Sequence, residues 1–247
     1  MISEFLFIGH RGTRIDFDEN TISAFIKAIE YGANYVEFDV RKTKDGNLVV
    51  LHDATLDRTT NGSGLLQKFT FKEVRIFKTK LQQLEIPLLT TVFDVLKGRA
   101  RFMIDLKEAN ILSKLVKIID DYDLVEDCVI SGRNLYELNY YKNNYPQGNI
   151  CYNITKGQGL SLNEFMNLSN YKKEKMKFDM ISLRSNLISS EFIEFCHKNM
   201  ITPLSWDFLN YKNPLQKIKS LTTLGIGGLL FDNYKNIREI KKWKNLI

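Results

Sequence analysis

Two histidines and two carboxylates are the side chains of this chain best suited by type and spacing to acid–base chemistry. Of the three histidines in the 247-residue sequence, His10 and His52 each follow an apolar run, FLFIG and NLVVL. Glu37 and Asp39 lie between them in NYVEFDV, and a strand turns side chains i and i+2 to the same face. Two imidazoles near paired oxygen ligands favour metal-assisted attack on a phosphate or acyl ester.

The composition is typical of a folded α/β protein and argues against a disordered or membrane-spanning chain. Hydrophobic residues make up 44% of the sequence and charged residues 26%, and no run of 18 apolar residues occurs. The amino-terminal MISEFLFIGH is too short and carries an acid, so we predict a cytoplasmic protein without a secretory signal. The three cysteines are widely spaced without a CxxC pair, which favours buried, reduced thiols.

The chain is basic, with a formal net charge of +6, and a charge of this sign can steer anions toward a protein. The densest basic segments, YKKEKMK and KNIREIKKWK, both fit the solvated face of a helix. An anionic surface partner is the alternative for these segments. Because the basic residues are otherwise spread out, we expect a small-molecule substrate and no nucleic-acid partner.

Strand-like and helix-like segments alternate along the whole chain. The main strands are expected near residues 5, 35, 101, 127, 149, 178, 201 and 226. Eight strand–helix units in a chain of this length predict a (β/α)₈ barrel over residues 1–247, with an open doubly wound sheet as the competing architecture. Residues 53–90 do not fit one strand–helix unit. They predict an insertion after the second strand, with a short helix at FTFKEVRIF and a hairpin before it at KDGNLVVLHD.

Polar side chains recur where the predicted strands end. Enzymes built on this barrel place their chemistry at the carboxyl ends of the strands. The residues at or just beyond those ends are His10, Glu37, Asp39, Asp105, Lys107, Ser131, Trp206 and Asp232. They come from different strands, so the fold would bring them to one mouth. Asp232 itself fits either a helix cap or a site role.

The linear pattern around the two histidines resembles the glycerophosphodiester phosphodiesterase family. IGHRG, then ENT at a helix start, then GANYVEFDVRKTKDGNLVVLHDATLDRTTNGSG, follow the family pattern almost throughout. Downstream, PLLTTVFDVL, MIDLK, ITPLSW and GIGGLLFDN resemble later family segments in the same order. The resemblance thus extends over most of the predicted barrel. It implies a (β/α)₈ barrel that hydrolyses glycerophosphodiesters to glycerol 3-phosphate and an alcohol with Ca²⁺ or Mg²⁺.

The resemblance also implies a role for individual residues. His10 and His52 would be the general base and the general acid. The metal ligands would be Glu37, Asp39 and Asp105. Arg11 and Lys107 would hold the phosphate, and Trp206 would help wall the alcohol pocket.

Two positions depart from the family pattern. Asp18 stands in DENT where the family usually has proline, which loosens a turn without touching a proposed catalytic group. Asp105 stands where the family usually has glutamate. Aspartate is one methylene shorter, so a metal must sit closer to this strand or bind through water. The departure leaves the identity of the metal open.

Three functions fit these observations to different degrees. The leading one is hydrolysis of deacylated head-group diesters such as glycerophosphocholine or glycerophosphoethanolamine. A rival is a related barrel phosphodiesterase acting on intact phospholipids or lysophospholipids, with the apolar residues of the insertion as a membrane-seeking rim: Leu65, Leu66, Phe69, Phe71, Ile76 and Phe77. A non-catalytic anion-binding barrel is the third, and it conflicts with the full set of acid–base residues.

Overall fold

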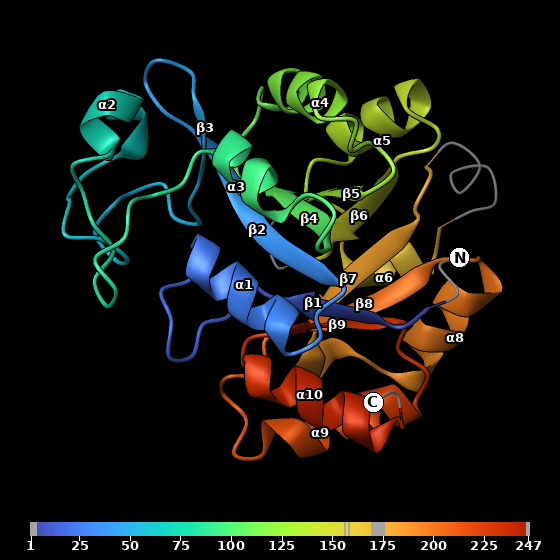
Figure 1. Cartoon of the computed structure of the whole chain (residues 1–247). Coiled ribbons are helices and arrows are strands. Elements are labelled where there is room, and N and C mark those ends of the chain that lie inside the picture. Colours follow the sequence, from blue (N-terminus) through green and yellow to red (C-terminus); the bar gives the residue numbers. More distant parts are fainter. Residues whose placement is uncertain (1–3, 156, 158, 169–175, 246–247) are drawn as a thin grey trace.

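A closed parallel β-barrel forms the centre of the protein in this computed structural model, which describes residues 4–155, 157, 159–168 and 176–245. Neighbouring strands pair in the order β1-β9-β8-β7-β6-β5-β4-β2, and the pairing of β1 with β2 closes the ring (Figure 1). Its strands are β1 (Leu6–Gly9), β2 (Tyr35–Lys42), β4 (Arg101–Leu106), β5 (Cys128–Gly132), β6 (Asn149–Asn153), β7 (Met180–Arg184), β8 (Thr202–Trp206) and β9 (Gly228–Phe231). The eight predicted strands and the barrel are confirmed, and the open sheet is excluded.

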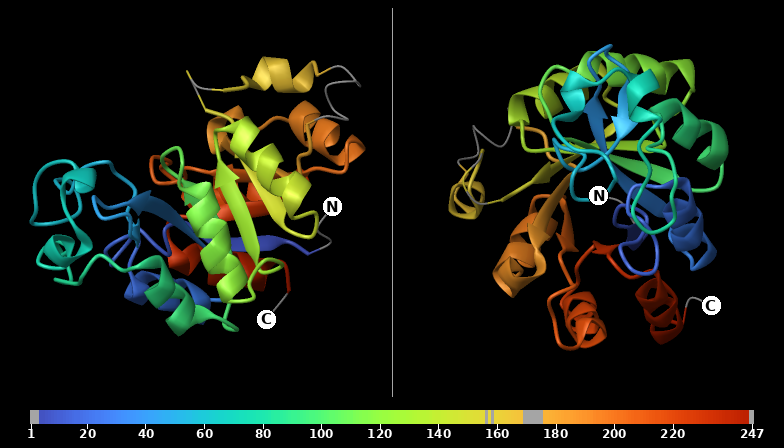
Figure 2. Two further views of the ribbon diagram at one scale, coloured as in Figure 1. Left: turned by 90° about the horizontal axis from the view of Figure 1, so that it is seen from above. Right: turned by 90° about the vertical axis from the view of Figure 1, so that its left-hand side faces the viewer.

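Helices cover the outside of the barrel, as Figures 1 and 2 show from three directions. The helices that follow barrel strands are α1 (Ile22–Glu30), α3 (Leu89–Leu96), α4 (Leu112–Asp121), α5 (Leu135–Asn144), α6 (Leu162–Met166), α8 (Ser190–Lys198), α9 (Pro214–Thr223) and α10 (Tyr234–Trp243). A short 3₁₀ turn, η2 (Ser185–Leu187), follows β7. The helix predicted from SLNEFMNLSNYKKEK is helical over Leu162–Met166, and residues 169–175 of that prediction lie outside the described residues.

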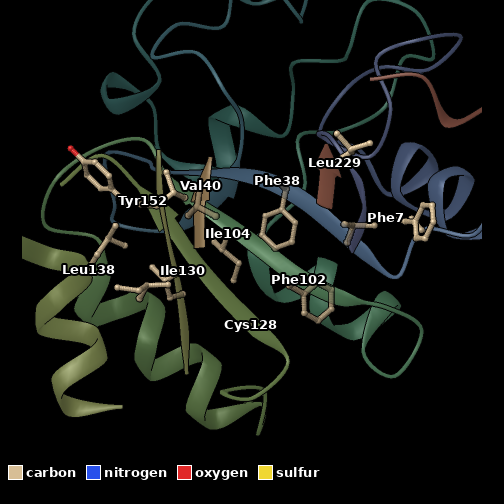
Figure 3. Close-up of a cluster of buried hydrophobic side chains, with 14 of the residues drawn as sticks. Phe7, Phe38, Val40, Phe102, Ile104, Cys128, Ile130, Leu138, Tyr152 and Leu229 are labelled. Atoms are coloured by element: carbon tan, nitrogen blue, oxygen red, sulfur yellow. The ribbon is translucent and has the colours of Figure 1, made fainter. Parts of the chain in front are cut away.

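The two faces of each barrel strand pack into two separate cores. Outward side chains such as Phe38, Phe102 and Ile130 meet the helices in one continuous apolar layer (Figure 3). Inward side chains, among them Ile8 and Met103, fill the barrel itself. Burying a side chain of this size stabilises the fold by about 1.5–3 kcal/mol, so the apolar side chains on both faces of each strand contribute to stability.

The insertion after β2 has a small core of its own. β3 (Leu48–Val50) pairs antiparallel with the end of β2, which confirms the predicted hairpin. A 3₁₀ turn, η1 (Leu66–Lys68), and α2 (Phe71–Val74) follow, and the insertion projects from the barrel in the left view of Figure 2. Its core is built from Val49, Leu51, Leu56, Leu66, Val74 and Ile86, with Phe69, Phe71, Phe77 and Leu88 packed against them.

The loop between β1 and α1 is held in a tight turn by backbone geometry. Gly12 has φ +76°, and a Cβ at this position would lie 2.6 Å from the backbone carbon of Ala24. Only glycine tolerates both conditions. Thr21 then caps α1 by accepting a hydrogen bond from the backbone N–H of Ala24. This turn brings the loop back over the barrel mouth.

All three cysteines are free and buried, as expected. No helix among the described residues is long and apolar enough to cross a membrane.

Candidate active site

Every barrel strand carries an inward apolar side chain followed, two residues later, by a polar or aromatic one. The apolar members form the floor of the barrel: Ile8, Tyr35, Met103, Val129, Cys151, Met180, Leu204 and Leu230. Two residues further on lie His10, Glu37, Asp105, Ser131, Asn153, Ser182, Trp206 and Asp232. All of the second set except Asp232 line one cleft of about 460 Å³ at the carboxyl ends of the strands. The period of two therefore builds a polar mouth on an apolar floor.

His10 is held by a carboxylate from the far end of the chain. Its Nδ1 lies 2.7 Å from Oδ1 of Asp232, which directly follows β9. The backbone N–H of Phe208 donates to the other oxygen of Asp232 at 2.9 Å. Burial alone would raise the pKa of Asp232, but His10, the Phe208 N–H and Arg14 together outweigh it and lower that pKa to about 2. The sequence left two roles open for Asp232, a helix cap or a site residue. In the structure Asp232 contacts His10, and Asn233 is the residue that caps α10.

His52 lies two residues after β3, directly before the insertion, and reaches the same cleft from another side. Its Nδ1 lies 2.6 Å from Oδ1 of Asp53, and Arg58 Nε donates to Oδ2 of the same carboxylate at 2.6 Å. Arg41 Nε donates to the His52 carbonyl at 2.8 Å and fixes the backbone there. Burial lowers the pKa of the His52 imidazole, although the charge of Asp39 opposes this shift. Sequence analysis missed Asp53, whose only local signal was its place next to His52.

Three carboxylates meet beside His10. Asp39 of β2 and Asp105 of β4 are directly opposite in the strand register. Oxygens of Glu37, Asp39 and Asp105 all lie within 4.8 Å of one another, and all three residues are buried. Burial, followed by repulsion from Asp39, raises the pKa of Glu37. Crowded, buried carboxylates of this kind require cations to balance them.

Two basic side chains supply part of that balance. Lys107 Nζ lies 2.9 Å from Oδ1 of Asp39 and also pairs with Asp105. Arg11 Nε lies 3.2 Å from the other oxygen of Asp39, and the backbone N–H of Arg11 donates to Glu37 at 2.8 Å. Burial would raise the pKa of Asp39, but Lys107 and Arg11 hold it well below its usual range. Two cations face three acids, so a hard cation with oxygen ligands fits the remaining negative charge.

The ENT segment, residues 19–21, hydrogen-bonds to this cluster: Asn20 contacts Asp39, and Glu19 contacts Arg11. Asn20 has φ +60°, and its Nδ2 donates to Oδ2 of Asp39 at 2.8 Å. Glu19 accepts hydrogen bonds from Arg11 at 2.8 Å and from Arg58 at 2.6 Å. Glu19 therefore links the loop after β1 to the insertion. It is a structural partner at the mouth.

Asp105 is oriented by a polar chain that the sequence did not reveal. Asn153 Nδ2 donates to Oδ1 of Asp105 at 2.8 Å and to Oγ of Ser131 at 2.9 Å. Ser182 Oγ in turn donates to Oδ1 of Asn153 at 2.5 Å. These residues end neighbouring strands β4 to β7. The available signal was the polar residue at each predicted strand end, but only Ser131 was singled out.

Trp206 stands at the end of β8 and lines the cleft, and its role as a wall of the alcohol pocket stays a prediction. The centroid of its ring lies 6.4 Å from that of His10 in an edge-on arrangement. The structure thus brings together all eight residues to which the resemblance assigned a role: His10, Arg11, Glu37, Asp39, His52, Asp105, Lys107 and Trp206. Seven line the cleft, and Asp39 lies directly behind them in contact with Lys107 and Arg11.

The barrel and the acid–base groups at its mouth define an enzyme of the (β/α)₈ class. The model of the glycerophosphoryl diester phosphodiesterase family matches residues 10–236. A glycerophosphodiester phosphodiesterase of Caldanaerobacter subterraneus subsp. tengcongensis is 33% identical over 241 residues, which cover 92% of this chain and 94% of the relative. The chain therefore belongs to the glycerophosphodiester phosphodiesterase family, and it is a phosphodiesterase by that membership.

Solved structures share the fold along the whole chain. The crystal structure of a glycerophosphodiester phosphodiesterase from Agrobacterium tumefaciens has a TM-score of 0.80 at 21% identity and covers 95% of this chain and 99% of its own. A phosphodiesterase of Oleispira antarctica, solved in complex with the product sn-glycerol-3-phosphate, has a TM-score of 0.81 at 21% identity, with 96% of each chain covered. At these identities the likeness concerns the fold.

Proposed function

We propose that this protein hydrolyses glycerophosphodiesters to glycerol 3-phosphate and an alcohol, with a divalent cation and two histidines. One observation carries the proposal. Two imidazoles, each held through Nδ1 by its own carboxylate, line the same cleft as a buried acidic triad. Phosphodiesters resist anionic attack, and this combination addresses both the charge and the proton transfers.

The histidines would divide the proton transfers between them. With its Nδ1 proton directed at Asp232, His10 keeps Nε2 available to accept a proton from the attacking oxygen. That oxygen belongs either to water or to the neighbouring hydroxyl of the substrate. His52, oriented by Asp53, would donate a proton to the departing alcohol. Each transfer would contribute on the order of 10²–10⁴ in rate.

The acidic triad would hold the cation. Glu37, Asp39 and Asp105 offer only oxygen ligands, which Ca²⁺ and Mg²⁺ both prefer. When bound, the metal supplies positive charge that offsets the negative charge developing on the phosphate oxygens. Arg11 and Lys107, already at the triad, would hold the same phosphate. Trp206 would form one wall beside the alcohol.

Cleavage of intact lipids has less support from the structure. Of the six apolar insertion residues proposed as a membrane rim, only Leu65 and Ile76 are exposed. The other four belong to the core of the insertion or pack against it. Small, deacylated diesters therefore remain the favoured substrates.

A coupled assay for glycerol 3-phosphate tests the proposal directly. Several glycerophosphodiesters are offered with Ca²⁺ or Mg²⁺ and again after chelation. We expect metal-dependent release that His10→Ala or His52→Ala abolishes, while His197→Ala, on the exposed face of α8, leaves it unchanged. Release that survives chelation, or normal turnover without either cleft histidine, would contradict the proposal.

A further inference from the structure

The period-two pattern of the strands continues one step beyond the acidic and polar layer. Two residues past Asp105, Ser131 and Ser182 lie Lys107, Arg133 and Arg184, and all three of these basic residues line the cleft. Lys107 pairs with the acidic triad. Arg133 directly follows β5, and Arg184 is the last residue of β7. The outer layer of the cleft at the ends of β4, β5 and β7 is therefore basic.

Arg184 covers the two groups that would attract a positively charged alcohol. Its guanidinium carbon lies 5.0 Å from the centroid of the Trp206 ring, a cation–π arrangement. Its Nε lies 3.5 Å from Oδ2 of Asp207. Arg184 and Trp206 are partners in the β7–β8 register, so the backbone itself sets them side by side.

The turn that carries Asp207 is held in place by a hydrogen bond from a buried serine. Asp207 has φ +69°, a conformation that most side chains avoid. The buried Ser185 donates from Oγ to the Asp207 carbonyl at 2.6 Å and contacts the Tyr211 hydroxyl at 3.1 Å. Trp206, Asp207 and Arg184 therefore form a defined wall of the cleft.

Quaternary and primary ammonium groups are recognised by aromatic faces and carboxylates. Outside the acidic triad, the described residues that line the cleft include two carboxylates, Asp53 and Asp207. Asp53 is bound by Arg58 and His52, and Asp207 faces Arg184. A cationic head group would have to displace an arginine to reach either one, whereas the Arg184 side chain is 58% exposed and can contact an anionic group beside its pair with Asp207.

We propose that Arg184 sets the head-group specificity of the cleft, disfavouring cationic alcohols such as choline and favouring alcohols that carry a further anion. The proposal rests on the proposed phosphodiesterase function and narrows its substrate class. The glycerol end is uncharged and common to all these diesters, so the charge of the second alcohol is what Arg184 distinguishes.

Three diesters of graded charge test this proposal. Glycerophosphocholine has a cationic alcohol, glycerophosphoglycerol a neutral one, and bis(glycerophospho)glycerol an alcohol with a second phosphodiester. We expect kcat/KM to rise in that order. Arg184→Ala should raise the ratio of glycerophosphocholine to bis(glycerophospho)glycerol turnover by about tenfold, because Trp206 and Asp207 become available. Arg184→Glu should raise the ratio further.

Arg238→Ala is the matched control for the loss of one arginine. Arg238 lies on α10 with its guanidinium carbon 4.0 Å from the Tyr31 ring centroid, outside the cleft. This variant removes the same charge and the same kind of contact, and it should keep the wild-type ratios. A wild-type preference for glycerophosphocholine, or an Arg184→Ala effect that is equal for all three diesters, would overturn the proposal.

Binding to the His10→Ala protein separates this proposal from the proposed function. Calorimetric Kd values for the three intact diesters need no turnover. If binding follows the expected charge order but the wild-type protein hydrolyses none of the diesters, the phosphodiesterase proposal is wrong and the selectivity is supported. If hydrolysis occurs but the Kd values do not depend on head-group charge, whether Arg184 is present or replaced, the proposal that Arg184 sets the selectivity is wrong.

Discussion

Nδ1 of His10 and Oδ1 of Asp232 lie 2.7 Å apart, although 222 positions of sequence separate the two residues. The pairing of β1 with β9 brings them together, since Gly9 and Phe231, their immediate neighbours, are register partners. The contact keeps the His10 proton on Nδ1 and leaves Nε2 on the side of Glu37, at 4.0 Å from its carboxylate. The pairing of the first and last barrel strands thus also sets the tautomer of the His10 imidazole.

Asp232→Asn is expected to impair the base without removing it. The amide would donate to Nδ1, so the ring proton would move to Nε2, where the proton of the nucleophile must go. We predict a fall in kcat/KM on the order of 10²–10⁴-fold, with a changed pH–rate profile. Asp16→Asn is the control, because Asp16 is exposed and pairs with Lys235. A wild-type pH–rate profile in Asp232→Asn would show that the contact only supports folding.

The separate roles of His10 and His52 predict different responses to the leaving group. A p-nitrophenyl ester of glycerol 3-phosphate releases a weakly basic phenolate that needs no proton donor. We predict that His52→Ala regains most of its activity on this ester, whereas His10→Ala stays inactive because the nucleophile still needs a base. Release of p-nitrophenol is followed by absorbance. Equal losses in both variants would contradict the division of roles.

The residues that the sequence located in advance share a local signal. Glu37 and Asp39 alternate with apolar residues in β2, and His10 directly follows the apolar run of β1, so the common face of the two acids and the strand end at His10 can be read without knowing the fold. The barrel then follows from the repetition of strand and helix. These features depend on short-range patterns, which a single sequence carries.

The residues that escaped sequence analysis depend on contacts between distant segments. Asn153 has no local pattern that links it to Asp105, and only the neighbouring registers of β4, β5 and β6 join them. The apolar residues of the insertion are equally ambiguous in sequence. Leu66 and Phe69 look like a membrane rim until the structure packs them into a separate core. Hydrophobicity indicates that a side chain is buried, but not what buries it.

The acidic triad predicts that metal binding stabilises the fold. At a metal concentration 100 times Kd, binding to the native state alone adds about 2.7 kcal/mol to the free energy of unfolding. Asp105→Asn should lose most of this increment, because it removes one of three ligands. Urea unfolding with Ca²⁺ or Mg²⁺, and again with chelator, measures the difference. Asp207→Asn removes a cleft carboxylate outside the triad and should keep the full increment. If chelation leaves the free energy of unfolding of the wild-type protein unchanged, the proposed metal site is contradicted.

Glu19 predicts a pH dependence of stability with a defined sign. Burial alone would raise the pKa of Glu19, but hydrogen bonds and charges from Arg58 and Arg11 lower it from 4.5 to about 2. A carboxylate with a depressed pKa stabilises the fold above its unfolded pKa, and this stability is lost as pH falls through the folded value. The shift corresponds to at most about 3 kcal/mol, since Arg58 is partly exposed to water.

Glu19→Gln should therefore lower the free energy of unfolding most at pH 7, and the gap from wild type should narrow as pH falls from 4.5 toward 2. Urea titrations at several pH values measure this gap. The amide also loses interactions that do not depend on pH, so a constant offset is expected beneath the trend. Glu239→Gln, on the exposed face of α10, should show no such trend. A gap that stays constant between pH 7 and 3 would mean that Glu19 joins the loop to the insertion by shape and hydrogen bonding rather than by charge.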